Sequence, residues 1–174
     1  MNAQVTLTNY ELFAAAIVGV RRHIEALQAG LVPNAGFDGE GWEIHIQGAC
    51  GEQAYAKYQD RFWSGSVNTF KSGGDVGLTQ IRTRSKSDYD LIVRDTDRDD
   101  DYFVLVIGTA PTFEIVGWMQ AKDAKQPQYG KSMADGRRRT LCRDPHCIRS
   151  RRSRETARRH HWPAGNRGCC LFWR

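Results

Sequence analysis

Residues 102–107 read YFVLVI, and this almost continuously apolar stretch decides the fold. A strand with one face in water alternates apolar and polar residues, whereas a strand covered on both faces is apolar throughout. Tyr102–Ile107 therefore predicts a central strand with a packed layer on each side.

Strand-like segments lie on both sides of this stretch. Gln80–Thr83 and Leu91–Val93 precede it and Phe113–Met119 follows it, with turn signals between them. A little helix is expected around Ala121–Lys125. The second half of the domain is thus predicted to be a sheet.

The first half has a helical period. Thr8-Asn9 can cap a helix that runs to about Ala29, and Gly30 is a stop signal. Apolar residues recur along it at three- and four-residue spacing and predict one apolar stripe, made of Leu12, Ala16, Val20, Ile24 and Leu27.

Two shorter segments follow this helix. Trp42–Ile46 alternates apolar and polar residues, which predicts a short half-buried strand or an extended entry segment. A second helix is expected over Gly51–Phe62, with Ala54, Tyr55 and Tyr58 on its inward face. Helices followed by strands predict a mixed α/β domain over residues 1–130.

Residues 131–174 differ abruptly from this body. Residues 1–130 hold 12 basic and 17 acidic residues, a net charge of −5, while residues 131–174 hold 13 and 3, a net charge of +10. The Arg-rich segment has no helical or strand period, and it is predicted to be a disordered basic C-terminal tail. The abrupt change also resembles sequence translated out of frame, so the tail is kept out of the fold prediction.

The chain is expected to be soluble and cytoplasmic. Its apolar run Leu12–Val20 is too short to span a bilayer, and Arg21 and Arg22 follow the run instead of preceding it as in a signal peptide. Five cysteines without a secretory signal indicate a reducing compartment. The four tail cysteines, Cys142, Cys147, Cys169 and Cys170, have no common zinc-finger spacing.

The stretch Gly74–Ser85, GDVGLTQIRTRS, carries the candidate chemistry. Gln80 and Arg82 point to the same face of a regular strand, whereas Asp75 and Gln80 would face opposite ways on an unbroken one. A turn or bulge at Gly77 is needed to bring Asp75 beside them. Hard oxygen ligands next to a cation suit divalent-metal phosphodiester chemistry.

Glu52 in GACGEQAYAKY, Asp75 in GDVG and the triplet Gln80-Ile81-Arg82 resemble the helix Glu, the Asp and the (D/E)xK triplet of the PD-(D/E)xK nuclease superfamily. The pieces Trp63–Gly65, Asp97–Val106 and Gly117-Trp118 extend the resemblance, over about residues 42–125, to small phage and prophage proteins of that type. The resemblance implies a restriction-endonuclease-like mixed sheet flanked by helices. It also implies Mg²⁺ or Mn²⁺ held by Asp75, Glu52, Gln80 and the Ile81 carbonyl.

Two residues depart from the family pattern. Gln80 stands where the superfamily usually has a carboxylate, although some modification-dependent restriction enzymes are similar in using Gln. Arg82 replaces Lys, and a guanidinium with a pKa above about 12 cannot act as a general base, though it can hold a phosphate.

The expected function is therefore divalent-metal-dependent DNA hydrolysis by a phage- or prophage-derived protein in the bacterial host cell. The alternative is a catalytically inactive module of the same fold that binds DNA or a host protein; either form is compatible with a homodimer and neither with a membrane. Simpler interpretations also stay open. Asp75, Gln80 and Arg82 can form the polar face of a hairpin, and Glu52 can be a first-turn acid on a helix. Asp95–Asp101 lacks the Gly and Glu of a calcium loop and is interpreted as a solvated acidic turn.

Overall fold

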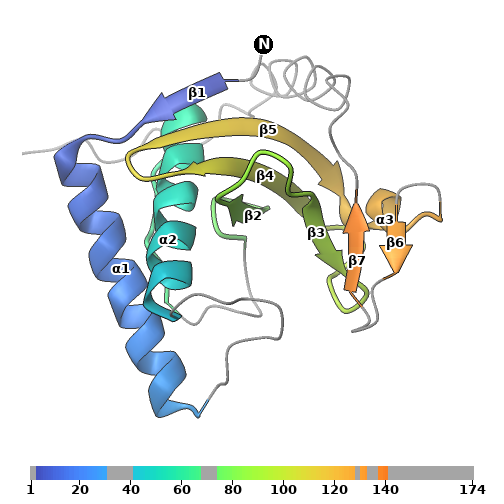
Figure 1. The fold of residues 1–174 in the computed structure, drawn as a ribbon, viewed down its shortest axis with the longest axis horizontal. Helices are drawn as coiled ribbons and strands as arrows, with labels where there is room; N and C mark the ends of the chain where they lie inside the picture. Colours follow the sequence, from blue (N-terminus) through green and yellow to red (C-terminus); the bar gives the residue numbers. More distant parts are fainter. Residues whose placement is uncertain (1–2, 31–40, 68–73, 128–129, 133–136, 141–174) are drawn as a thin grey trace, which may run out of the picture.

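The computed structural model describes residues 3–30, 41–67, 74–127, 130–132 and 137–140. Within them the chain forms, in order, β1 (Ala3–Thr6), α1 (Asn9–Gln28), α2 (Gly41–Tyr58), β2 (Thr79–Arg84), β3 (Leu91–Arg94), β4 (Tyr102–Thr109), β5 (Thr112–Gln120), α3 (Ala121–Ala124), β6 (Gly130–Ser132) and β7 (Arg137–Thr140). Figure 1 shows α1 and α2 side by side against one part of a sheet, with β3, β6 and β7 at its other end. The predicted α/β class is confirmed.

The first helix begins where the sequence predicts. The Thr8 hydroxyl accepts a hydrogen bond from the Glu11 N–H at 3.3 Å, and the Glu11 carboxylate accepts one from the Thr8 N–H at 2.7 Å. This reciprocal capping box satisfies two backbone donors that no helical carbonyl can reach. At the other end Gly30 has a φ of +63°, which suits the glycine that ends a helix.

The buried side of α1 is not the stripe expected from its apolar residues. Ala15, Gly19 and His23 are the buried residues, whereas Ile24 and Leu27 are 42 and 58 % exposed. The reason is close packing on α2: a Cβ on Gly19 would lie 2.5 Å from the Ile46 Cα. Small residues let the two backbones approach, so the large ones face away.

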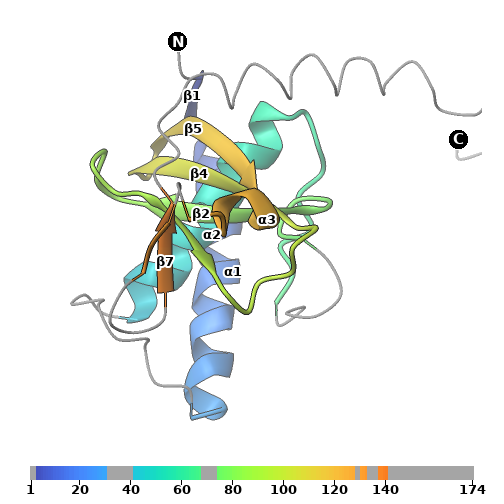
Figure 2. The same ribbon diagram turned by 90° about the vertical axis from the view of Figure 1, so that its right-hand side faces the viewer.

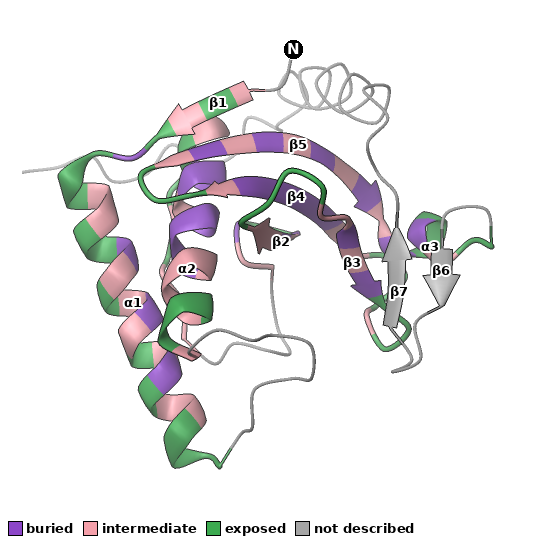
Figure 3. Cartoon of the chain, viewed as in Figure 1, coloured by how far each residue is buried: buried purple, intermediate pink, exposed green. Residues whose placement is uncertain are grey.

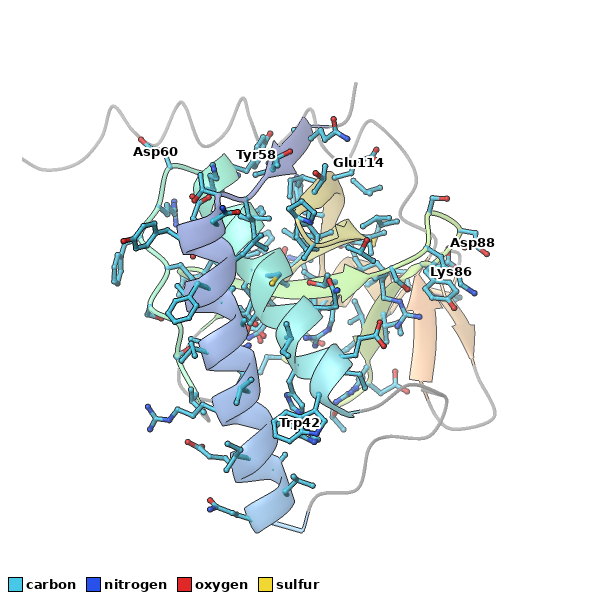
Figure 4. The ribbon with its side chains drawn as sticks, turned by 60° about the vertical axis from the view of Figure 1, so that its left-hand side comes forward. Trp42, Tyr58, Asp60, Lys86, Asp88 and Glu114 are labelled. Atoms are coloured by element: carbon cyan, nitrogen blue, oxygen red, sulfur yellow. The ribbon has the colours of Figure 1, made fainter. Side chains whose placement is uncertain are left out.

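The expected strand over Trp42–Ile46 is wrong, because these residues form the first turns of α2. Trp42 and Ile44 are 39 and 37 % exposed, so their alternation with polar neighbours does not mark a half-buried sheet face. Figure 4 shows Trp42 beside α1, where its ring centroid lies 4.2 Å from that of His23. The helix also ends before the expected Phe62, since Asp60 takes a φ of +52° and the Arg61 N–H bonds the Ala56 carbonyl at 2.9 Å.

A four-stranded mixed sheet has the order β1-β5-β4-β2. β2 runs parallel to β4, with Ile81 opposite Val104, and β5 is antiparallel to both β4 and β1. The four strands predicted from Gln80 onward are confirmed. β1 was not predicted, and it places the start of the chain at one edge of the sheet.

The central strand is covered on both faces, as its apolar sequence predicts. Val104 and Val106 belong to a core shared with α2, including Ala54 and Tyr55. Phe103 and Leu105 belong to a second core with β3 and α3. Figure 2 shows α1 and α2 on one side of this sheet and α3 on the other, and Figure 3 shows the buried residues concentrated in β4 and β5.

A smaller sheet has the order β3-β7-β6. β7 is antiparallel to β3, with Ile92 opposite Arg139, so this sheet uses residues beyond position 130, where the body was expected to end. The remainder of the expected tail, residues 141–174 with its four cysteines, lies outside the described residues. In the part of the chain that is described, no helix has the length and apolar character needed to cross a membrane.

Candidate functional site

A tight turn brings Asp75 back to β2. Val76 and Thr79 bridge each other, each donating its N–H to the other's carbonyl at 3.1 Å, and Gly77 between them has a φ of +62°. Beyond the turn, the Ile81 N–H donates a 2.6 Å hydrogen bond to the Asp75 Oδ2. The turn required at Gly77 is therefore present, and it fixes the Asp75 carboxylate beside the triplet.

Asp75 lies at the β2 edge of the four-stranded sheet, where no other described strand pairs with β2. β2 is the last strand in the order and pairs only with β4 in that sheet, so the Ile81 N–H that reaches Asp75 points away from β4. The N–H and C=O of one strand residue point in the same lateral direction. The Ile81 carbonyl therefore faces the same edge as the Asp75 carboxylate.

Glu52 projects from the middle of α2 and is held from two sides. Arg22 of α1 donates two hydrogen bonds to its oxygens, at 2.6 Å to Oε1 and 2.9 Å to Oε2, and the Trp63 indole N–H donates a third at 3.1 Å. The Glu52 side chain is only 8 % exposed and that of Arg22 16 %. Arg22 also donates to the Ser66 carbonyl at 2.7 and 3.0 Å. The result is a buried, bidentate ion pair between the two helices.

The Glu52 and Asp75 carboxylates lie within electrostatic range of each other. Burial raises the pKa of Glu52, and the charge of Asp75 raises it further, while hydrogen bonds from Arg22 and Trp63 oppose the rise. Burial likewise raises the pKa of Asp75, against the Ile81 N–H and the charges of Arg82 and Arg22. The Asp75 carboxylate thus lies within the electrostatic influence of Glu52, Arg22 and Arg82.

Gln80 and Arg82 lie on the opposite face of β2 from Glu52. Ile81 packs in the core shared with α2, and a Cβ on Gly51 of α2 would collide with the Thr83 side chain, so odd-numbered positions face the helices. The Arg82 guanidinium instead lies over the Phe103 ring, 4.7 Å from its centroid, on the side of the second core. By strand alternation Gln80 shares that face.

Arg82 has acidic neighbours on both sides. Its Nη2 lies 3.5 Å from the Asp97 Oδ2, and its charge also acts on Asp75. Burial lowers the pKa of Arg82, and the charges of Asp97 and Asp75 oppose this. Asp75 at the edge is therefore the residue through which the two faces interact.

The acidic segment Asp95–Asp101 forms the turn expected between β3 and β4. The carboxylates of Asp97 and Asp99 form hydrogen bonds within the protein. The Asp97 carboxylate accepts the Arg94 N–H at 2.8 Å. Lys125 donates to the Asp97 carbonyl at 2.5 Å and to the Asp99 carboxylate at 2.6 Å. Lys125, at the end of α3, therefore ties this turn to the helix.

The capacity of the edge for a metal depends on Arg22. Among the described residues, no three His, Cys, Asp or Glu side chains are grouped closely enough to hold an ion. The oxygen donors at the edge are the Asp75 carboxylate and the Ile81 carbonyl, with Glu52 as the second carboxylate in range. Both Glu52 oxygens already accept hydrogen bonds, Oε2 from both Arg22 and Trp63, so Arg22 competes with a cation for this carboxylate.

Sequence reasoning named Glu52, Asp75, Gln80, Ile81 and Arg82 and missed Arg22 and Trp63. Arg22 had a detectable signal, since it follows Ala15 and Gly19 at the spacing that keeps three residues on one helix face.

The chain matches no protein-family model, no curated protein and no solved structure.

Proposed function

We propose that this protein is a divalent-metal-dependent hydrolase of DNA phosphodiesters, with a fold of the restriction-endonuclease type. The observation that carries the proposal is the position of Asp75. It lies at a sheet edge that no other described strand covers, in electrostatic range of the helix-borne Glu52 on one face and of Arg82 on the other. This is the set of segments that the resemblance to the PD-(D/E)xK superfamily implies.

The donor set at the edge fits a hard cation in part. Asp75 and the Ile81 carbonyl supply oxygens, and the raised pKa values of Asp75 and Glu52 reflect desolvated negative charge that a cation relieves. Mg²⁺ or Mn²⁺ bound there supplies a water of lowered pKa and charge stabilisation for the phosphate. Gln80 departs from the pattern, because it lies on the other face from Glu52.

The protein's own residues have separate roles in this proposal. Asp75 fixes the β2 backbone at Ile81 by accepting the Ile81 N–H. Arg82 holds the scissile phosphate by its charge, since its protonated guanidinium cannot accept a proton at neutral pH. The Arg82 side chain is 28 % exposed, so part of it reaches the surface although its guanidinium packs on the Phe103 ring beside Asp97. We place this activity in a phage or prophage context and in the host cytoplasm, as the resemblance implies.

One observation favours the second candidate, a non-catalytic module that binds DNA or a host protein. The bidentate contact of Arg22 satisfies Glu52 without any metal, at distances typical of charge-assisted hydrogen bonds. Removing one partner of such a buried pair costs about 3–5 kcal/mol. If Arg22 stays in place, only Asp75 remains as a charged ligand.

The test is cleavage of plasmid and oligonucleotide DNA by the full chain with Mg²⁺, Mn²⁺ or EDTA. The informative variant is Asp75→Asn, which retains an acceptor for the Ile81 N–H but loses the charge. Asp88→Ala is the matched control, because Asp88 is an exposed acid on the loop after β2 (Figure 4). We expect metal-dependent cleavage that Asp75→Asn lowers at least about 100-fold, or roughly 2.7 kcal/mol.

The outcomes separate the two candidates. Equal cleavage by the unmodified chain and Asp75→Asn excludes this site as the source of activity. DNA binding without cleavage in any metal supports the module. If the protein neither binds nor cleaves DNA, a function on DNA is overturned.

A further inference from the structure

The outer face of α1 carries a continuous row of large apolar side chains. Five of them are strongly exposed: Tyr10 88 %, Phe13 69 %, Ile17 54 %, Ile24 42 % and Leu27 58 %. With half-buried Val20 they recur at spacings of three, four, three, four and three residues. This is the a/d pattern of three consecutive heptads, the signature of a helix that pairs with another helix.

The six side chains of this row, from Tyr10 to Leu27, form a seam that no described element covers. The opposite side of α1, with Ala15, Gly19 and His23, packs on α2. Figures 1 and 4 show α1 at the margin of the molecule, with its other side turned away from α2 and from the sheet. One helix therefore uses its small residues for the fold and leaves its heptad residues exposed.

We propose that the seam of α1 is a dimer interface, occupied by α1 of a second copy of this chain in antiparallel orientation. Antiparallel pairing about the middle of the seam sets Tyr10 against Leu27, Phe13 against Ile24 and Ile17 against Val20 of the second copy. Each aromatic ring then meets an aliphatic side chain, whereas parallel pairing would set Tyr10 on Tyr10 and Phe13 on Phe13. Antiparallel pairing also aligns the two helix dipoles favourably.

The size of the seam supports this occupant. At about 200 Å² for a large apolar side chain, the exposed fractions of the five side chains amount to roughly 600 Å² on each copy. That is at the upper end of single apolar patches on monomers, about 300–600 Å². Flanking side chains add to it, so the total approaches the roughly 800 Å² per partner of a stable protein interface.

The flanks of the seam favour a second copy over a charged partner. Ala14 and Ala16 border its N-terminal half and are small enough to let another helix approach. In the C-terminal half, Arg21 is paired with Glu25 on its own helix at 3.2 Å. A face that is apolar along its middle and uncharged or internally neutralised at its borders complements itself under a two-fold axis.

The first test is the molar mass of the full chain in solution, by light scattering and sedimentation between about 1 and 100 µM, a range that brackets micromolar dimers. We expect a dimer, and a dissociation constant raised at least about 100-fold by Ile17→Glu, since each dimer would bury two unpaired carboxylates. The matched control is Phe62→Glu, at an apolar residue 91 % exposed outside the seam, which should leave the dimer intact. Circular dichroism checks that both variants keep their helices.

Orientation is tested by charge pairing. Phe13→Glu alone should give a monomer, and adding Ile24→Lys should restore the dimer, because the two positions face each other only in antiparallel pairs. A double variant that stays monomeric overturns the orientation. A monomeric unmodified chain, a dimer unaffected by Ile17→Glu, or equal loss in Phe62→Glu overturns the interface.

Discussion

Replacing Arg22 by Met should destabilise the protein strongly and in a pH-dependent manner. The Arg22–Glu52 pair has two hydrogen bonds of 2.6 and 2.9 Å and side chains 16 and 8 % exposed, so solvent screens it little. Two unit charges about 4 Å apart at an effective dielectric constant of about 20 attract by about 4 kcal/mol. Removing one partner of a buried pair costs about 3–5 kcal/mol, and we expect Arg22→Met to lose that much at pH 8.

Acid should reduce the loss. Burial and Asp75 raise the pKa of Glu52 above its unfolded value, and removal of Arg22 takes away two opposing influences. An acid with a raised folded pKa is most stabilising below its unfolded pKa, and that contribution is lost as the pH rises through the folded pKa. Arg22→Met should therefore approach the stability of the unmodified chain as the pH falls from 8 toward 5.

Urea unfolding followed by tryptophan fluorescence and circular dichroism measures both effects, and Trp63 lies in direct contact with Glu52. The double variant Arg22→Met/Glu52→Gln is the control, because a neutral amide can still accept from Trp63 while no buried charge is left unpaired. It should regain at least half of the loss at pH 8. A single variant within about 0.5 kcal/mol of the unmodified chain at pH 8 would refute the assignment of a buried, interacting pair.

Four further substitutions test other parts of the structure. Gly19→Ala should cost about 1–3 kcal/mol, because its Cβ would meet the Ile46 backbone at 2.5 Å, whereas Gly48→Ala, with nothing within 4 Å, should gain about 0.5–1 kcal/mol; opposite shifts in Tm check the helix contact. Thr8→Ala should cost about 1 kcal/mol by removing the capping box, as measured by urea unfolding, and an unchanged midpoint would contradict the cap. Asp75→Asn should stabilise the protein by on the order of 1 kcal/mol at pH 7, as expected where function needs a desolvated charge. That gain should shrink as the pH falls through the raised pKa of Asp75, because the carboxyl in the folded state then takes up a proton and loses its charge; a gain that is constant with pH would contradict it.

The sequence predicted those elements whose signals are local. Thr8 and Gly30 mark the ends of α1 because capping depends on a few neighbouring residues. The continuously apolar Tyr102–Ile107 predicted a strand buried on both faces, because the pattern of a strand reflects its two neighbouring layers. Trp42–Ile46 was misassigned because five alternating residues fit both a strand and the partly exposed first turns of a helix. β1 was not predicted, because its pairing with β5 joins residues more than 100 positions apart in the sequence.

The site was predictable in its members but not in its arrangement. The turn at Gly77 follows from the glycine itself, and the proximity of Asp75 to Ile81 follows from the turn. Which face of β2 meets α2 is decided by packing at Gly51 and Thr83, which no local pattern contains. Hence the separation of Glu52 from Gln80 and Arg82 appeared only in three dimensions.

Gln80 and Arg82, the two departures from the nuclease-like pattern, have the same effect on the charge balance at the sheet edge. Metal sites usually carry excess negative charge that the cation neutralises. Here Glu52 is paired with Arg22, and the charge of Arg82 acts on both Asp97 and Asp75, so much of the negative charge near the edge is already compensated. A carboxylate in place of Gln80 would make the edge more negative, and Lys in place of Arg82 would provide a cation able to lose its proton. Gln80 and Arg82 therefore both lower the attraction for a divalent ion, and release of Glu52 from its two hydrogen bonds with Arg22 would raise it.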